Sequence, residues 1–319
     1  MDVRRLKYFV QIVESGSLSK ASRQLFIVQP ALSQQMTRLE EEVGKPLLVR
    51  SVRGVVPTEN GEALYHHAKF VLRQLEEAVQ VARQDYASVH GRVTLGLAPS
   101  TSAIVGLPML RHIKEKYPGI LLNVVVGLPI YMEERARQSQ VDVAVLFSKT
   151  AASEFTVEPL LEEEVFLVVP VDSKLVPPER ESLTLAEVAA LPLVLASPGH
   201  NLRRRLNVEF ERANVEPNMM AEIDSLQLMM RYVAEIGGAT IQTMAGTRAA
   251  GSLDGWRCLS ISDARIMRPS YLYALPVQKL SQASAVVRTE LRQIVHSLVE
   301  SGAWRGVRLT PPAPEDVQD

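Results

Sequence analysis

The stretch from Ser17 to Glu42 constrains the fold most, because it holds two short helical patterns separated by a tight break. Pro30 suits the first turn of the second helix, where its missing N–H needs no partner and its φ is already helical. Leu32, Met36, Leu39 and Val43 recur at spacings of four, three and four residues, which places them on one face of that helix. The two patterns therefore predict a helix-turn-helix.

The opposite face of the second predicted helix is polar. Its side chains are of the kinds that hydrogen-bond to base edges and phosphate oxygens, namely Gln29, Ser33, Gln34, Thr37 and Arg38. In the first helix, Ser17 is a good N-cap and Ala21 is small enough for two helices to cross closely. The pattern predicts that the second helix enters the major groove of DNA. A helical hairpin with a merely solvated outer face is the alternative.

A β-hairpin is predicted directly after this unit. Gly44 and Pro46 end the second helix, and two short apolar segments, 47–50 and 55–57, flank a turn. We interpret the hairpin as the wing of a winged helix, with Arg50 and Arg53 where the wing meets DNA. Arg53, near the tip, would reach the phosphate backbone or the minor groove. The alternative for a single arginine is a surface charge.

Thr58 begins a long amphipathic helix that we expect to run to about Ala87, a length of about 45 Å. Apolar residues recur along it at alternating spacings of four and three, which is a heptad seam: Leu64, Ala68, Val71, Leu75, Ala78 and Ala82. Because so small a head cannot bury this seam, we expect it to pair with a second copy of the chain. Packing of the seam on the downstream domain is the alternative.

From Gly91 onward, apolar strands alternate with amphipathic helices, which favours an α/β fold with parallel sheets. The pattern allows one large sheet or two lobes. The predicted strands are 93–97, 121–126, 141–147, 165–169, 193–195, 219–223, 239–242 and 271–275. The predicted helices are 103–117, 132–139, a short helix capped by Thr184 and Glu187, one after Asn201, 225–236 and 282–301.

Helices that begin in Ser- and Thr-rich turns place N–H groups at strand ends, where α/β folds bind ligands and anions. Ser100, Thr101 and Ser102 follow the first strand in this way, and His200 and Asn201 precede a later helix. These five residues are candidates for contact with a small molecule. The alternative for each is that it only caps its helix.

Composition removes several classes of protein. Cys258 is the single cysteine, so an internal disulfide or a paired-cysteine zinc site cannot form. No apolar run could span a bilayer, and the N-terminus lacks a signal sequence, so we expect a cytoplasmic protein with no membrane partner. Adjacent His66 and His67 cannot share a metal, and nucleophile-elbow and phosphate-loop motifs are absent from the sequence. We expect no metal, no cofactor and no catalysis, with a hydrolase or a solute-binding protein as weaker alternatives.

Charge is unevenly distributed along the chain. Residues 1–58 carry nine Lys or Arg against five Asp or Glu, whereas the full chain of 319 residues has a net charge of −1. A basic head on an acidic body is typical of a regulated DNA-binding protein, because the positive charge steers the head towards phosphates.

The segment GSLSKASRQLFIVQPALSQQMTRLEEEVGKPLLVRSVRGVVPTENG, residues 16–61, resembles the DNA-binding region of LysR-type transcriptional regulators along nearly its whole length. GRVTLGLAPS, YPGILLNVVVG and VDVAVLF resemble the family's effector domain, a two-lobed fold like that of periplasmic binding proteins. The head (RRLKYFVQIVESGSL and VQPALSQQ) and the segments PLLEEEVFLV, AEIDSLQLM and HSLVES are similar to the nitrogen assimilation control subgroup of that family.

The resemblance implies roles for particular residues. The DNA-binding set would be Leu18, Ser19, Lys20, Gln29, Pro30, Ala31, Ser33, Gln34, Thr37, Arg38, Arg50 and Arg53. Many relatives carry Arg where Gln34 stands, so the group that Gln34 touches stays open. The cleft between the lobes would be lined by Ser100, Thr101, Ser102, Phe147, His200, Asn201 and Thr243. Family members commonly pair as homodimers, assemble into homotetramers and contact RNA polymerase, while some in the nitrogen subgroup act without a small inducer.

We therefore expect a sequence-specific DNA-binding transcriptional regulator of overall α/β class, associated with the nucleoid when it binds its operator. The expected domains are a winged helix-turn-helix (1–58), a linker helix (59–90), an effector domain (91–302) and a disordered tail (303–319). Within the effector domain, lobe one would comprise 92–161 and 269–301, and lobe two 162–268. The alternative within the family is a regulator of a catabolic pathway that responds to a small carboxylate inducer.

Overall fold

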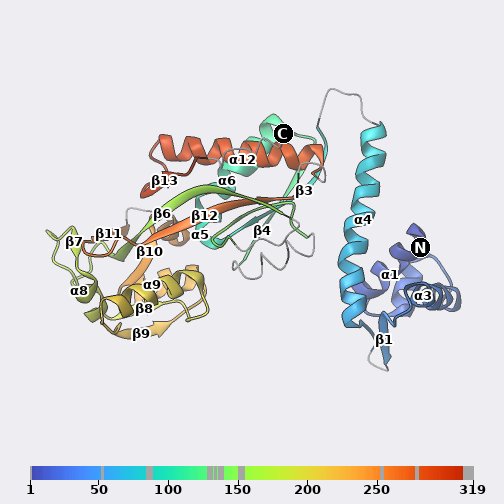
Figure 1. Ribbon diagram of the computed structural model, residues 1–319, viewed down its shortest axis with the longest axis horizontal. Helices are drawn as coiled ribbons and strands as arrows, with labels where there is room; N and C mark the ends of the chain where they lie inside the picture. Colours follow the sequence, from blue (N-terminus) through green and yellow to red (C-terminus); the bar gives the residue numbers. More distant parts are fainter. Residues whose placement is uncertain are drawn as a thin grey trace, which may run out of the picture. The chain divides into compact units, whose positions relative to one another are not determined.

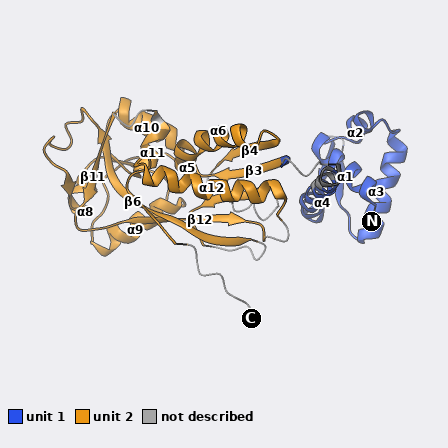
Figure 2. Cartoon of the chain, turned by 90° about the horizontal axis from the view of Figure 1, so that it is seen from above, with its two compact units in different colours: residues 1–91, 134–140 blue, residues 92–133, 141–319 orange. Residues whose placement is uncertain are grey.

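The computed structural model describes residues 2–51, 54–83, 89–127, 132, 135, 140–149, 155–251, 255–276 and 280–311. The chain divides into two compact units, which Figure 2 colours separately. The first comprises residues 1–91 with 134–140, and the second comprises 92–133 with 141–319. In the described part of the chain, no helix is long and apolar enough to cross a membrane.

The first unit is a winged helix-turn-helix followed by a long helix (Figure 1). Its elements are α1 (Val3–Ser15), α2 (Leu18–Leu25), α3 (Gln29–Val43), β1 (Leu48–Ser51), β2 (Gly54–Pro57) and α4 (Glu59–Arg83). Three of the four residues predicted on the inward face of α3 pack against α1, α2 and the wing in one core: Phe9, Ile12, Ala21, Leu32, Met36, Leu39, Leu47, Leu48 and Val55. The fourth, Val43, is 40% exposed because it is the last residue of the helix, beyond this core. The predicted helix-turn-helix and hairpin are both confirmed.

Local chemistry sets the boundaries of the helix-turn-helix. Ser17 Oγ accepts the backbone N–H of Lys20 at 3.4 Å and so begins α2. Phe26 ends α2 in the left-handed conformation, with φ of 55°, and Pro30 lies in the first turn of α3. The turn between the helices is therefore encoded by a cap, a left-handed residue and a proline.

Close contacts fix the wing against the helices. The Glu40 carboxylate on α3 accepts the backbone N–H groups of Leu47 and Leu48 at 2.8 and 3.1 Å. Gly61 on α4 lies so near Leu47 that a Cβ at this position would be 1.9 Å from the Leu47 carbonyl oxygen. Only glycine allows α4 to pack this closely against the wing.

The second unit contains a mixed nine-stranded sheet, in the order β4-β3-β5-β12-β6-β11-β7, with β10 and β13 also paired to β6. Its strands are β3 (Gly91–Leu97), β4 (Ile120–Val126), β5 (Val143–Leu146), β6 (Thr156–Pro170), β7 (Ser182–Leu183), β10 (Thr240–Thr243), β11 (Trp256–Ile261), β12 (Met267–Ala274) and β13 (Val307–Leu309). A separate parallel pair consists of β8 (Leu193–Leu195) and β9 (Met219–Glu222).

The second unit also contains helices and short helical turns. They are α5 (Pro99–Thr101), a π-helical turn η1 (Ser102–Gly106), α6 (Leu107–Lys116), α8 (Leu185–Ala190), α9 (Asn201–Arg212), α10 (Leu226–Glu235), α11 (Met244–Thr247), the 3-10 turn η2 (Arg248–Ala250) and α12 (Gln282–Glu300). Figure 1 shows β6 and β12 running from the part of the sheet beside α6 and α12 towards the part beside α8 and α9. These two strands connect the two lobes.

The prediction of purely parallel sheets is wrong. β3 and β5 are parallel, but β6 pairs antiparallel with β10, β11, β12 and β13. β6 is also three times as long as the predicted strand 165–169, because its first half carries Glu158 and Glu162–Glu164, which interrupt the apolar pattern. A long strand that serves both lobes therefore gives a weak signal in the sequence.

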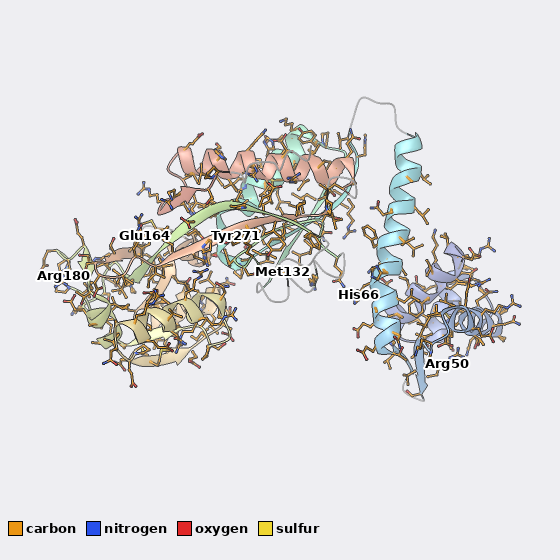
Figure 3. The ribbon with its side chains drawn as sticks, in the orientation of Figure 1. Arg50, His66, Met132, Glu164, Arg180 and Tyr271 are labelled. Atoms are coloured by element: carbon orange, nitrogen blue, oxygen red, sulfur yellow. The ribbon has the colours of Figure 1, made fainter. Side chains whose placement is uncertain are left out.

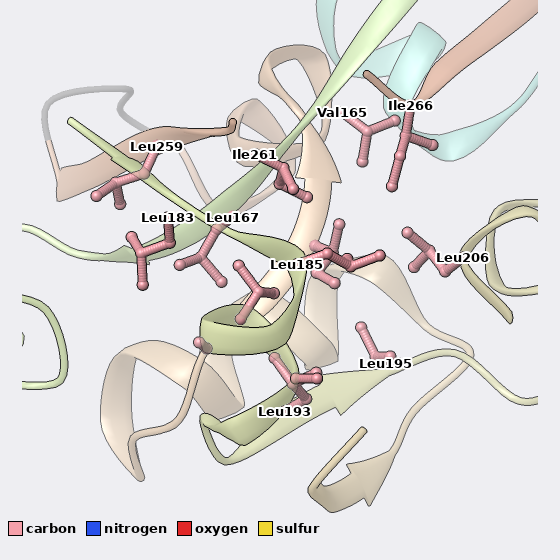
Figure 4. Packing of buried hydrophobic residues seen from close by; sticks show 14 of the residues in the cluster. Val165, Leu167, Leu183, Leu185, Leu193, Leu195, Leu206, Leu259, Ile261 and Ile266 are labelled. Carbon is pink, nitrogen blue, oxygen red and sulfur yellow. The ribbon is translucent and has the colours of Figure 1, made fainter. Parts of the chain in front are cut away.

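The core of the second lobe forms around the second half of β6 (Figure 4). Val165, Leu167 and Val169 alternate along the strand and contribute to this core, while Phe166 and Val168 between them are buried in a separate cluster. Residues from α8, α9, β8 and β11 also belong to this core, including Leu185, Leu206, Leu193, Leu259 and Ile261. The predicted capping box at Thr184 and Glu187 is present and begins α8 on this core.

Two further predictions about the second unit were wrong, and a third falls on residues outside the described part of the chain. The helix predicted to begin at residue 103 begins at Pro99, so Ser100–Ser102 lie inside its first turns. Residues 303–311, expected to be disordered, are ordered instead: Trp304 is buried and β13 pairs with β6. The predicted helix 132–139 lies outside the described residues, apart from Met132 and Arg135.

Candidate DNA-binding surface and effector cleft

The polar face of α3 is exposed, as its periodicity predicted. Gln29, Pro30, Gln34, Thr37 and Arg38 are all exposed, while Ala31 and Ser33 are half-buried. The opposite face is held in the core of the winged helix, so the helix cannot rotate to bury its polar side chains. The first unit therefore presents a continuous row of hydrogen-bonding groups along one helix.

Hydrogen bonds orient two of these side chains from neighbouring elements. Arg50, labelled in Figure 3 on β1, donates from Nη1 to Ser33 Oγ at 2.7 Å. Ser19 Oγ on α2 donates to Gln29 Oε1 at 2.8 Å. Because Gln29 keeps its NH₂ group free of that bond, its two amide donors stay available to an external acceptor. Arg53 lies outside the described residues.

The first helix of the motif contributes unequally. Ser19 and Lys20 are exposed, whereas Leu18 packs against the core of the unit. Two exposed apolar side chains were not singled out from the sequence: Phe26 is 95% exposed and Val28 is 71% exposed. Both adjoin the start of α3, where exposed apolar groups can contact sugars and thymine methyl groups. Their position just before Gln29-Pro30 was the only available signal.

In the second unit, Arg268 of β12 fills the position where the sequence predicted a small effector. Its guanidinium lies over the Phe147 ring, 3.9 Å from the ring centroid. It donates to Ser100 Oγ at 3.0 Å and to Thr243 Oγ1 at 3.2 Å. Glu163, directly opposite on β6, accepts from Nε and Nη2 of Arg268. Arg268 is 2% exposed and Glu163 is 1% exposed, so this is a fully buried ion pair.

Little space remains beside this pair. A cavity of about 30 Å³ is lined by Ser100, Phe147, His200, Arg268 and other residues, which is room for water rather than for a metabolite. Burial and the nearby positive charge of Arg268 lower the pKa of the His200 imidazole, so this group is neutral near pH 7. Within the described residues, His200 Nδ1 is buried and has no hydrogen-bond partner.

The remaining predicted cleft residues divide into two groups. Thr101 Oγ1 and Asn201 Oδ1 are buried and unpartnered in the part of the chain that the structure describes. Ser102 Oγ instead donates to the Pro99 carbonyl oxygen at 2.9 Å, a bond within its own helix. The structure thus brings Ser100, Phe147 and Thr243 together on Arg268. Ser102 neither joins them nor caps its helix, because its hydroxyl donates to a carbonyl of the preceding turn.

The central pair of this cleft was missed from the sequence. Arg268 and Glu163 are 105 residues apart and meet only because β12 pairs with β6. Charged residues on half-exposed strands are ordinary, so neither one suggested a buried site. In the described part of the chain, no cluster of His, Cys, Asp and Glu residues could hold a metal ion.

Two family models together match most of the chain. Residues 3–62 match the bacterial regulatory helix-turn-helix proteins of the lysR family, and residues 87–295 match the LysR substrate binding domain. The chain belongs to the LysR family of transcriptional regulators. As a member of this family, it is a DNA-binding transcriptional regulator with a two-lobed substrate-binding domain.

Individual LysR proteins extend the match over almost the whole chain. The nitrogen assimilation regulatory protein nac of Klebsiella aerogenes is 33% identical over 302 residues, covering 94% of this chain and 95% of the relative. The protein of the same name from Escherichia coli (strain K12) is 31% identical over 313 residues, covering 96% and 99%. The resemblance to the nitrogen assimilation control subgroup therefore reaches from end to end.

Solved structures of LysR proteins share the fold. A full-length variant of OxyR from Pseudomonas aeruginosa has a TM-score of 0.71 at 17% identity, covering 98% of this chain and 99% of that chain. CbnR in complex with its target DNA has a TM-score of 0.65 at 18% identity, covering 92% and 100%. The order of winged helix, long helix and two-lobed domain is therefore a LysR architecture.

The heptad seam of α4 is packed against its own domain at its first positions and exposed further along the helix. Leu64 packs against the core of the winged helix, and Ala68 is buried. Further along, Val71 and Leu75 are each 41% exposed and Ala78 is also exposed. The side chain of Ala82 lies outside the described residues. The first two seam positions thus fasten α4 to its own domain, and the following ones are left uncovered.

Proposed function

We propose that this LysR regulator controls genes of nitrogen assimilation, and that it does so as a homodimer that assembles into a homotetramer on DNA. The observation that carries the nitrogen assignment is the end-to-end match to the two nac proteins, which extends through the effector domain as well as the DNA-binding domain. It acts in the cytoplasm on nucleoid DNA, requires no cofactor, catalyses no reaction and affects transcription through contact with RNA polymerase.

Its sequence recognition would come from α3 in the major groove. Gln29, Ser33 and Gln34 read base edges, because their amides and hydroxyl point away from the core of the winged helix. Lys20, Arg38, Arg50 and Arg53 bind phosphates or the minor groove and set the register. The bond from Arg50 to Ser33 supports this arrangement, since it links a phosphate-binding group to a base-reading one.

Dimerisation would use the uncovered part of α4. Val71, Leu75, Ala78 and Val79 are exposed along the helix beyond the winged-helix core. Apolar residues with this heptad spacing favour packing against a second copy of the same helix. Such pairing places two copies of α3 on successive half-sites of an operator.

Within the effector domain, the buried Arg268–Glu163 pair supports regulation in which no small inducer enters the cleft. The second candidate is regulation of a catabolic pathway by a small carboxylate. The unpartnered polar atoms of Thr101, His200 and Asn201 favour this candidate, since a ligand would satisfy them. A carboxylate inducer would then have to displace Glu163 from Arg268.

The test is selection of genomic fragments by the purified full-length chain, followed by footprinting of the recovered sites. We expect an interrupted palindrome beside nitrogen genes, with protection over two half-sites. Recovered sites that lie beside catabolic operons and need an added carboxylate would favour the second candidate. Enrichment of single half-sites alone would contradict dimeric binding.

A further inference from the structure

The effector domain contains a second, larger cavity, whose lining residues differ from those of the Arg268 cleft. Its volume is about 250 Å³, close to the lower limit for sites that bind small molecules. Ile104 of η1, Met244 of α11, Trp256 and Cys258 of β11, and Trp304 supply apolar walls. The two aromatic rings make this a suitable enclosure for one flat ring or a short branched hydrocarbon.

Two arginines, Arg248 and Arg305, complete the lining. Arg248 is half-buried and donates one hydrogen bond, from Nη2 to the Ala303 carbonyl oxygen at 2.8 Å. Arg305 is exposed, and its Nε makes a long bond of 3.4 Å to the Gly302 carbonyl oxygen. In the described part of the chain neither guanidinium meets a carboxylate, so most of their N–H donors are unused.

This lack of acidic partners distinguishes the cavity from the cleft. The guanidinium of Arg268 is neutralised by Glu163 inside the fold. The second cavity contains two positive charges, and among the described residues no acidic one lines it. An apolar enclosure with uncompensated guanidinium groups has the character of a site for an organic anion, because a carboxylate accepts two parallel N–H bonds from one arginine.

The wall that carries Trp304 is held in place without a ligand. The Trp304 backbone N–H donates to the Leu298 carbonyl oxygen at 2.8 Å, and its indole Nε1 donates to Glu163 Oε1 at 3.3 Å. The following Gly306 accepts from the Glu164 backbone N–H at 2.7 Å and adopts φ of 68°, which suits glycine. The cavity is therefore preformed, which lowers the free energy lost on binding.

We propose that this cavity binds a small monocarboxylate with an apolar or aromatic body. The body packs between Trp256 and Trp304, and the carboxylate accepts hydrogen bonds from Arg248 and Arg305. The site is separate from the cleft formed by Ser100, Phe147, Thr243 and Arg268, so the proposal does not depend on which genes the regulator controls.

The two tryptophans of the chain allow a direct test, because both line the cavity. The full-length protein is titrated with phenylacetate while tryptophan fluorescence is recorded, with phenylacetamide and inorganic phosphate as uncharged and non-apolar probes. We expect a saturable change with phenylacetate only. The absence of a saturable change would overturn the proposal. An equal response to phenylacetamide would also overturn it, because the arginines would then not recognise the carboxylate. An equal response to phosphate would overturn it too, because the apolar enclosure would then contribute nothing.

Arginine variants make the test specific to this cavity. Arg305→Gln changes an exposed side chain and should weaken phenylacetate binding about tenfold, because a charge-assisted hydrogen bond is lost. Arg248→Gln should weaken it at least as much. Arg308→Gln is the matched control, since Arg308 is exposed nearby in the sequence but pairs with Glu162 and does not line the cavity. Equal binding by all variants would overturn the assignment.

Cys258 provides an independent readout that does not require a change in fluorescence. It is the single cysteine and lies in the cavity wall, and burial raises the pKa of its thiol to about 11. Alkylation by iodoacetamide in mildly alkaline buffer is therefore slow and rises with pH. Phenylacetate should slow it severalfold, whereas phenylacetamide should not. Unchanged alkylation at saturating phenylacetate would show that the ligand does not occupy this cavity.

Discussion

The DNA-binding surface and the effector cleft use similar polar side chains in opposite ways. On α3, Gln29 and Gln34 are exposed. Gln29 Oε1 accepts one bond from Ser19 of the same chain, and its amide donors are left for an external partner. In the cleft, Ser100 and Thr243 are buried, and Arg268 from the same chain already bonds to them. Residue type alone therefore does not identify a recognition site. Whether the fold supplies an internal partner for each group decides it.

The largest effect is expected when the buried ion pair of the cleft, Arg268 with Glu163, is broken. Glu163→Leu leaves the Arg268 guanidinium buried without its carboxylate, so the free energy of unfolding should fall by about 3–5 kcal/mol. Chemical denaturation of the full-length protein measures it. The adjacent Glu162→Leu is the control, because Glu162 pairs with the exposed Arg308 and should cost less than about 1 kcal/mol. Similar losses for both variants would contradict an internally satisfied cleft.

A pH dependence tests whether a second buried carboxylate in the same unit is satisfied in the same way. Burial opposes ionisation of Glu290, but hydrogen bonds from Lys116, Tyr117 and His112 outweigh it and lower its pKa to about 2. Because the folded-state pKa lies below the ordinary value of 4.5, this stabilisation is fully present above pH 4.5. It is lost as the pH falls towards about 2.

Comparison of Glu290→Gln with the unaltered protein isolates this contribution. The difference between their free energies of unfolding should be largest above pH 4.5 and should shrink as the pH falls towards 2. Denaturation curves at a series of pH values measure it. A difference that stays constant across this range would mean that Glu290 is not held ionised by its neighbours.

On the DNA-binding side, removal of one outward-facing group should affect specificity rather than stability. Gln29→Ala or Ser33→Ala should weaken binding to the operator by about 1–3 kcal/mol and leave binding to random DNA nearly unchanged. Gln24→Ala, a change on α2, is the matched control. Equal losses on operator and random DNA would show that these side chains do not read bases.

The smallest effect expected is electrostatic. Arg53→Ala should reduce the slope of log affinity against log salt by about 1, because one phosphate contact is lost. Binding to operator and random DNA should weaken by similar factors. Titration at several salt concentrations measures the slope. The same slope for both proteins would remove Arg53 from the phosphate-binding set and narrow the surface to α3 and Arg50.

Prediction from sequence succeeded where the interactions are local. Ser17 begins α2, Pro30 lies in the first turn of α3, and the Thr184–Glu187 capping box begins α8, each as predicted. Prediction was less successful for β6, because glutamates interrupt the apolar pattern of this strand, which both lobes share. It was wrong for residues 303–311, where a segment without periodicity is ordered by pairing with β6 and by burial of Trp304.

By itself, the sequence determined the winged helix, because caps, turn residues and helical periodicity act within a few residues and point to one arrangement. It also determined the family, through a long continuous motif. Only the tertiary structure decided which buried polar side chains pair with one another in the effector domain. The Arg268–Glu163 pair joins residues 105 apart, and Trp304 reaches Glu163 across 141. Such pairs arise from strand pairing and burial, which have no short-range pattern in the chain.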